Sequence, residues 1–209
     1  MFRYGVLIVF LGVLLGGFMP TGAAAAEARL VFEVKTGQIL TVPAKDGQPQ
    51  KVLPDHDLKM SLPGRLFQKP QVIKPNLMAG NKTPAALLAT MLEANKRAAV
   101  PAMVGAFLPD EQPALLKAYK QPALVQSSAK FFQNISGMTY DGLAGYRGFV
   151  LLLVTYDTPA GRTRLVMPAR QQGGHYYLTN GLASDSTLSE VLVAWHNQQV
   201  TPFTGEAGK

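Results

Sequence analysis

Hydrophobic residues between positions 84 and 135 recur at the spacing of helices, and prolines interrupt them at short intervals. Leu87, Leu88, Met91 and Leu92, for example, fall on one helix face, because side chains three and four positions apart lie above one another. Each proline limits a helix, since it lacks the amide hydrogen that a helix interior needs. The pattern therefore predicts four short helices, which begin near Pro84, Pro101, Asp110 and Pro122.

From residue 137 onward the pattern is typical of strands. The continuous apolar run 149–154 is short and bounded by turn residues, which favours a central strand buried on both faces. Residues 162–167 are its expected hairpin partner, and 138–140 and 175–179 complete an antiparallel meander. Helical spacing returns from about Ser186. The pattern predicts the α+β class, with helices segregated from an antiparallel sheet.

The N-terminal third has a different composition. Residues 29–35 and 38–42 flank Thr36-Gly37, which predicts a β-hairpin. Seven prolines then fall between residues 43 and 84, so we expect an extended arm with at most one short strand, at 71–73. The predicted organisation is a hairpin and Pro-rich arm over 27–83, an α+β body over 84–197 and a frayed tail over 198–209.

The first 26 residues have the three parts of a secretory signal. Met1–Tyr4 carries one positive charge, residues 5–19 are apolar, and small residues end the segment at Ala26. The apolar run is shorter than the ~20 residues of a membrane-spanning helix, so we expect cleavage near Ala24–Ala26 and no stable transmembrane anchor. An uncleaved N-terminal anchor is the alternative.

The chain has no cysteine, which excludes disulfides and a lipid attached to an N-terminal cysteine. Small exported animal domains usually depend on disulfides, so the composition favours the periplasm of a Gram-negative bacterium, and otherwise secretion.

The net charge is +7, and much of the excess lies between residues 44 and 82, where seven Lys and Arg face three Asp. Such an arm could dock to an anionic component of the cell envelope, or it could be a solvated linker. Nucleic acid is excluded as a partner, because the protein is expected outside the cytoplasm and the arm has a single aromatic residue, Phe67.

The order of elements from residue 84 to about 183 resembles the nuclear-transport-factor-2-like (cystatin-like) superfamily. Two expected helices meet at a corner over 95–100, the second ends in Phe107-Leu108-Pro109-Asp110, and the last strand has the sequence Gly-Gly-His-Tyr-Tyr-Leu-Thr-Asn over 173–180. Ala98-Ala99 occupies the corner where members often have Gly-Asp. The resemblance implies a cone-like sheet curved around helices, with an apolar pocket. Enzymes, ligand binders and assembly modules share this fold, so it does not select a function.

Three residues are candidates for acid–base catalysis in such a pocket: His175, Tyr156 and Asp141. Tyr156 and His175 also have ordinary structural interpretations, since tyrosine is common in strands and a histidine at a strand end is usually solvated. No nucleophile motif accompanies them.

Two other groups of polar residues could bind ligands. Asp55-His56-Asp57 places three potential metal ligands in succession, but neighbours on an extended chain point to alternate sides, so a polar bend is the favoured interpretation and no metal is expected. Arg162 and Arg164 share one strand face, and with Arg147 and Arg170 they could receive an anion or form a solvated surface.

These observations favour a non-enzymatic exported protein that binds a partner protein or an apolar small molecule, without a cofactor. The alternatives are a small-molecule isomerase or hydrolase with its site in the cone, and an envelope-associated protein that docks through its basic arm.

We expect the mature protein to begin between Ala25 and Glu27 when the full chain is expressed in a Gram-negative host. Intact-mass spectrometry of the periplasmic fraction measures this. A full-length mass confined to the membrane fraction would contradict the signal peptide.

Overall fold

The computed structural model describes residues 28–43 and 49–203. The predicted signal peptide, part of the predicted arm and the last six residues of the predicted tail lie outside these ranges. Within them no helix has the length and apolarity needed to cross a bilayer.

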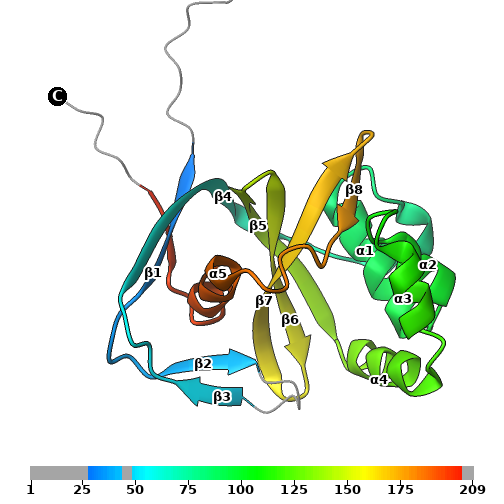
Figure 1. Ribbon diagram of the computed structural model, residues 1–209, viewed down its shortest axis with the longest axis horizontal. Helices are drawn as coiled ribbons and strands as arrows, with labels where there is room; N and C mark the ends of the chain where they lie inside the picture. Colours follow the sequence, from blue (N-terminus) through cyan, green and yellow to red (C-terminus); the bar gives the residue numbers. More distant parts are fainter. Residues whose placement is uncertain (1–27, 44–48, 204–209) are drawn as a thin grey trace, which may run out of the picture.

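Seven strands form one antiparallel sheet in the order β8-β7-β6-β5-β4-β1-β9 (Figure 1). The strands are β1 (Arg29–Val34), β4 (Leu58–Val72), β5 (Gly137–Tyr146), β6 (Phe149–Thr158), β7 (Gly161–Gln172), β8 (His175–Leu178) and β9 (Val200–Pro202). A separate ribbon pairs β2 (Leu40–Pro43) with β3 (Pro49–Val52). The large sheet is not closed into a barrel, because β8 and β9 are its two ends. The chain thus combines helices with an antiparallel sheet.

The helices begin within two residues of the expected positions. They are α1 (Pro84–Lys96), α2 (Val100–Gly105), α3 (Gln112–Ala118), α4 (Pro122–Gln133) and α5 (Ser186–His196), with a 3-10 turn, η1 (Leu77–Ala79), before α1. Thr83 caps α1 by accepting a hydrogen bond from the amide of Ala86, and Asp185 caps α5 by accepting one from Leu188. These side chains satisfy amide groups that have no partner within the helix.

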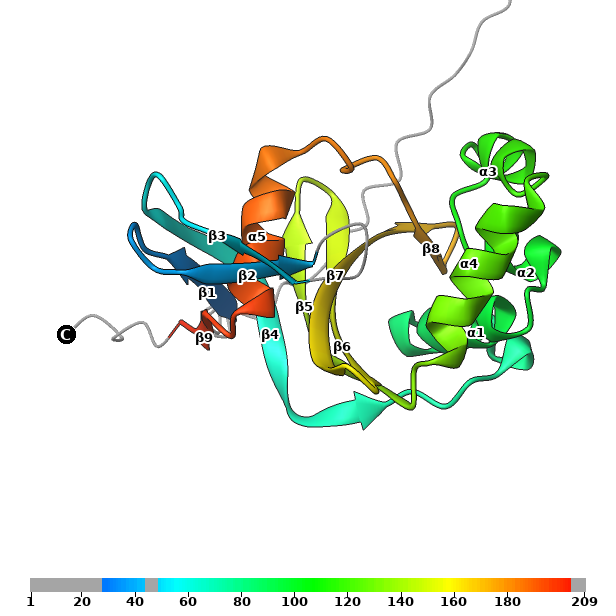
Figure 2. The same cartoon turned by 90° about the horizontal axis from the view of Figure 1, so that it is seen from below.

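Strand β6 is buried on both faces, as the apolar run predicted. Its alternate side chains enter two different cores, with Leu152 and Val154 in one and Leu151 and Leu153 in the other. Helices α1 and α4 lie on the side of the first core, whereas α5 and β1 lie on the side of the second (Figure 2). The sheet is therefore the middle layer of the molecule.

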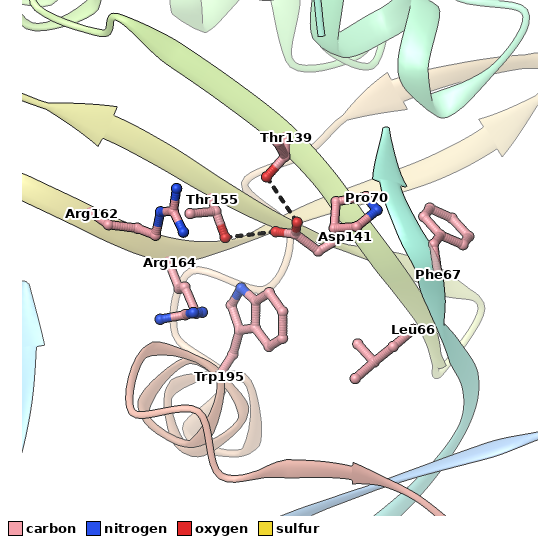
Figure 3. Close-up of a pocket in the computed structure, with 9 residues that line it drawn as sticks. All are labelled: Leu66, Phe67, Pro70, Thr139, Asp141, Thr155, Arg162, Arg164 and Trp195. Carbon is pink, nitrogen blue, oxygen red and sulfur yellow. Dashed lines mark hydrogen bonds between the residues drawn. The ribbon is translucent and has the colours of Figure 1, made fainter. Parts of the chain in front are cut away.

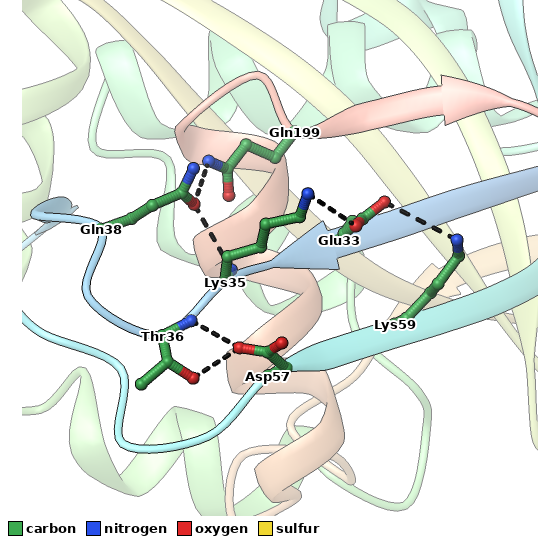
Figure 4. Close-up of polar contacts among 7 residues, drawn as sticks. All are labelled: Glu33, Lys35, Thr36, Gln38, Asp57, Lys59 and Gln199. Atoms are coloured by element: carbon green, nitrogen blue, oxygen red, sulfur yellow. Dashed lines mark hydrogen bonds and ion pairs between the residues drawn. The ribbon is translucent and has the colours of Figure 1, made fainter.

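The predicted N-terminal hairpin is wrong. Strand β1 pairs with β4 and β9, while β2 pairs with β3. The reason is burial, since the alternate side chains Leu30, Phe32 and Val34 contribute to the second core. A two-stranded hairpin alone would leave that apolar face in water. Polar contacts fix the turn after β1, where the Asp57 carboxylate accepts hydrogen bonds from the amide, at 2.7 Å, and the hydroxyl of Thr36 (Figure 4).

The predicted irregular arm is also wrong, because residues 58–72 form β4, a 15-residue strand between β1 and β5. Its prolines stand where the pairing changes. Pro63 is at the end of the register with β1, and Pro70 lies in a stretch that skips the ladder with β5. A proline is tolerated at such positions because no amide hydrogen is required there.

The predicted frayed tail begins too early. Strand β9 pairs with β1, and the amide of Phe203 donates to the carbonyl of Arg29 at 2.9 Å. Val200 is buried in the second core, which explains why this short segment is held on the sheet.

We expect Gly142→Ala to lower the free energy of unfolding by about 1–3 kcal/mol, the usual effect of overpacking. A Cβ at Gly142 would lie 2.4 Å from the backbone oxygen of Arg65 on β4, so the two strands would have to separate. The matched control is Gly105→Ala at the end of α2, where a Cβ meets nothing within 4 Å. It should raise stability by about 0.5–1 kcal/mol. Urea unfolding of the mature protein measures both, and equal effects would contradict the close approach.

Candidate functional site

Two irregularities in neighbouring strands open a pocket in the sheet. Strand β5 has a bulge at Asp141, between the residues that pair with Val154 and Leu153. On the facing strand, the register with β5 shifts between Leu66 and Gln71. A bulge leaves residues outside the ladder and redirects their side chains. The resulting pocket has a volume of about 390 Å³, which falls in the ~300–1,000 Å³ range of small-molecule sites.

The pocket has an apolar wall and a polar wall (Figure 3). Leu66, Phe67 and Pro70 of β4, together with Trp195 of α5, form the apolar wall. Strands β5, β6 and β7 supply the polar wall, whose residues are Thr139, Asp141, Thr155, Arg162 and Arg164. Thr139, Thr155 and Arg164 are successive partners across the three strands, so the sheet register itself places them in one row.

The Asp141 carboxylate is held by two threonine hydroxyls. Thr139 donates a hydrogen bond to Oδ1 at 2.8 Å, and Thr155 donates one to Oδ2 at 2.6 Å. An ionised carboxylate can accept about four hydrogen bonds, so each oxygen keeps capacity for a further donor. Within the described ranges Asp141 has no ion-pair partner.

Trp195 is fixed in position and in turn orients Arg164. The indole N–H donates to the carbonyl of Val154 at 3.2 Å, and the ring is almost fully buried. The guanidinium carbon of Arg164 lies 5.9 Å from the indole centroid, within the range of a cation–π contact. His196, the next residue of α5, has its Nδ1 3.2 Å from the carbonyl oxygen of Arg164. The end of α5 thus holds both the backbone and the side chain of this arginine.

The two arginines of the pocket differ in their partners. Arg162 donates to Asp157 at 2.8 Å, and this contact raises the pKa of the guanidinium further above its ordinary value. Arg164 makes no ion pair with any residue of the described chain. With Asp141 opposite, the charged groups that line the pocket sum to +1 at neutral pH.

The three predicted catalytic candidates do not come together. Asp141 lines the pocket, but Tyr156 lies on the opposite face of the sheet in the first core. Burial raises the pKa of the Tyr156 hydroxyl, whose partner is the sulfur of Met167 at 3.3 Å. His175 begins strand β8, with Nδ1 3.0 Å from the carbonyl of Gly173.

Of the four arginines named in the sequence analysis, two line the pocket and two lie elsewhere. Arg162 and Arg164 share the pocket, as strand alternation predicts. Arg147 pairs with Asp185 at 3.3 Å, and the Arg170 guanidinium lies 5.8 Å from the ring centroid of Phe149. No single cluster of four forms.

Asp55-His56-Asp57 forms a bend, and its side chains separate. Nδ1 of His56 lies 2.6 Å from Asp55, and Nε2 lies 3.2 Å from Glu190 of α5, whereas Asp57 turns to Thr36. Asp55, His56 and Glu190 border a smaller apolar cavity of about 190 Å³. In the part of the chain that the structure describes, no three His, Asp or Glu side chains converge as metal ligands.

Sequence reasoning missed most of the pocket. The sequence indicates Arg162 and Arg164 through their alternation with apolar residues, and Asp141 as a candidate acid or base beside an expected strand. Trp195 fits an ordinary apolar helix face and Phe67 lies in the expected arm, and only the tertiary structure brings them to the arginines (Figure 3).

No protein-family model matches the chain, and neither the curated proteins nor the solved structures contain a match to it.

We expect the pKa of His56 to lie above its ordinary 6.5, because two carboxylates stabilise the imidazolium. Asp55→Asn should lower that pKa more than Glu190→Gln, since the hydrogen bond to Asp55 is the larger cause. The bridge should stabilise the fold fully below the unfolded-state pKa and lose this effect as pH rises through the folded-state pKa. Histidine NMR titration of the wild type and both variants measures the shifts. A larger decrease of the His56 pKa in Glu190→Gln than in Asp55→Asn would contradict the prediction that Asp55 is the main partner of the imidazole.

Proposed function

We propose that this protein is an exported, periplasmic binding protein whose pocket between β4, β5 and α5 takes a small molecule with an anionic group and an apolar part. The observation that carries the proposal is Arg164, which is oriented on Trp195 and has no carboxylate partner in the described chain. An arginine held in this way loses less conformational freedom when it binds an anion.

The surroundings of Arg164 support such a ligand. Arg162 lies two residues away on the same strand face and adds a second guanidinium, while its partner Asp157 leaves only part of its donors free. Guanidinium groups favour carboxylate and related anions because their planar donors match two oxygens at once. Leu66, Phe67 and the Trp195 ring supply an apolar surface for the remainder of the ligand.

The same pocket favours binding over catalysis. Among the described residues that line it, Asp141 is the only acidic side chain, and no histidine, cysteine, serine or lysine is present. Thr139 and Thr155 both donate their hydroxyl hydrogens to the one carboxylate, Asp141, and among the described lining residues no second carboxylate or histidine stands beside it to act as its acid–base partner. Acid–base mechanisms generally use a second titratable group to return the proton or to orient the base.

The resemblance to the nuclear-transport-factor-2-like superfamily, with its cone-like sheet, remains part of the proposal. Helices on one face of an open antiparallel sheet are compatible with it. The pocket described above lies on the other face, beside α5, and therefore differs in place from the cone pocket that the resemblance implies.

We expect 3-phenylpropionate to bind the mature protein and its neutral amide to bind at least about tenfold more weakly, the usual effect of losing a charged hydrogen bond. Arg164→Gln should remove the difference between the two compounds. Arg170→Gln is the matched control, because Arg170 is also stacked on an aromatic ring but lies outside this pocket.

Isothermal titration calorimetry measures the affinities, and thermal melting checks that both variants are folded. Equal affinity of the wild type for acid and amide would contradict an anion site. So would a loss of acid binding in Arg170→Gln that is as large as the loss in Arg164→Gln.

A further inference from the structure

We infer that the ligand of this pocket is a zwitterion, whose carboxylate is received by Arg164 and whose ammonium group is received by Asp141. The inference rests on the proposed function and identifies the class of ligand. Its basis is that one pocket holds a cation and an anion of the protein, neither of which has an ion-pair partner in the described chain.

Asp141 argues against a ligand that carries only negative charge. Its carboxylate lines the same pocket as Arg164, so an anion bound there would also face a like charge. A ligand that carries an ammonium group beside its carboxylate converts this repulsion into attraction. The site would then bind a simple acid more weakly than the corresponding zwitterion, because unfavourable contacts are a common source of specificity.

The two threonines keep Asp141 available for such a group. Thr139 and Thr155 each take one lone pair on a different carboxylate oxygen, which fixes the plane of the carboxylate on the bulge of β5. The remaining lone pairs can accept from an ammonium group, which has three donors to share. Because the threonines are neighbours in the register of β5 and β6, this arrangement belongs to the folded sheet and does not require the ligand.

Arg164 and Asp141 are held apart by separate anchors. Arg164 stacks on Trp195 at the end of α5, whereas Asp141 is bonded to residues of β5 and β6 (Figure 3). They form no ion pair with each other, and both line the open volume of about 390 Å³. Two fixed, opposite charges across a pocket are complementary to a molecule with its own two charges in the reverse order.

The test uses three compounds that share a phenyl ring and differ in their charges: L-phenylalanine, 3-phenylpropionate without the amine, and phenethylamine without the carboxylate. We expect L-phenylalanine to bind the mature wild-type protein at least about tenfold more tightly than either of the others, since each lacks one charged hydrogen bond. N-acetyl-L-phenylalanine, which keeps the carboxylate but not the ammonium, should bind no better than 3-phenylpropionate.

Asp141→Asn should abolish the preference for L-phenylalanine over 3-phenylpropionate, while Arg164→Gln should abolish its preference over phenethylamine. Calorimetry measures the four affinities in each protein. Because the comparison among ligands on the wild type needs no substitution, it remains decisive if Asp141→Asn fails to fold.

The outcomes separate this inference from the proposed function. Equal affinity for L-phenylalanine and 3-phenylpropionate would overturn the zwitterion and leave the anion site standing. An unchanged preference in folded Asp141→Asn would overturn the role of Asp141. The absence of binding by all four compounds would overturn both proposals.

Discussion

The burial of β6 on both of its faces is the constraint on which the rest of the structure depends. Six consecutive side chains, from Leu151 to Tyr156, are shielded from water, so each face of the sheet needs its own cover. Helices α1 and α4 cover one face, and α5 with β1 covers the other. Removing either cover would expose apolar surface of the central strand to water, which costs about 25 cal/mol of folding free energy for each Å². This requirement draws β1, β4 and β9 into the sheet.

The pocket lies at the end of α5, where the apolar cover of the second face of the sheet stops. Helix α5 finishes at His196, and beyond it the sheet face carries Thr139, Thr155 and Arg164 where leucines and valines stand elsewhere. The bulge at Asp141 and the irregular stretch of β4 fall at the same level, so the regular pairing is interrupted where the apolar cover stops. A site at such a boundary can combine rigid backbone with exposed polar groups, because the buried part of each strand positions the exposed part.

The electrostatics of the pocket depend on which charged side chains the fold places in ion pairs and which it leaves without an ion-pair partner. Arg162 is matched with Asp157, and Arg147 with Asp185, in exposed ion pairs of the kind that contribute little to stability. Arg164 and Asp141 are held by an indole ring and by two hydroxyls, which orient a charge without neutralising it. Orientation without neutralisation is the feature that makes these two residues suited to a charged ligand.

The sequence alone determined the elements whose signals are local. Thr83 with Pro84, the run 149–154 and the spacing up to Trp195 specified α1, β6 and α5, because caps, turns and periodicity act over a few residues. It did not determine that residues 58–72 form a central strand, since the prolines there weaken the strand pattern and pairing with β1 and β5 supplies the stabilisation. Asp141 and Arg164 could be named in advance, but their meeting with Trp195 and Phe67 required the tertiary structure. These four residues come from four different elements, and only the packing of α5 on the sheet decides which of them share a pocket.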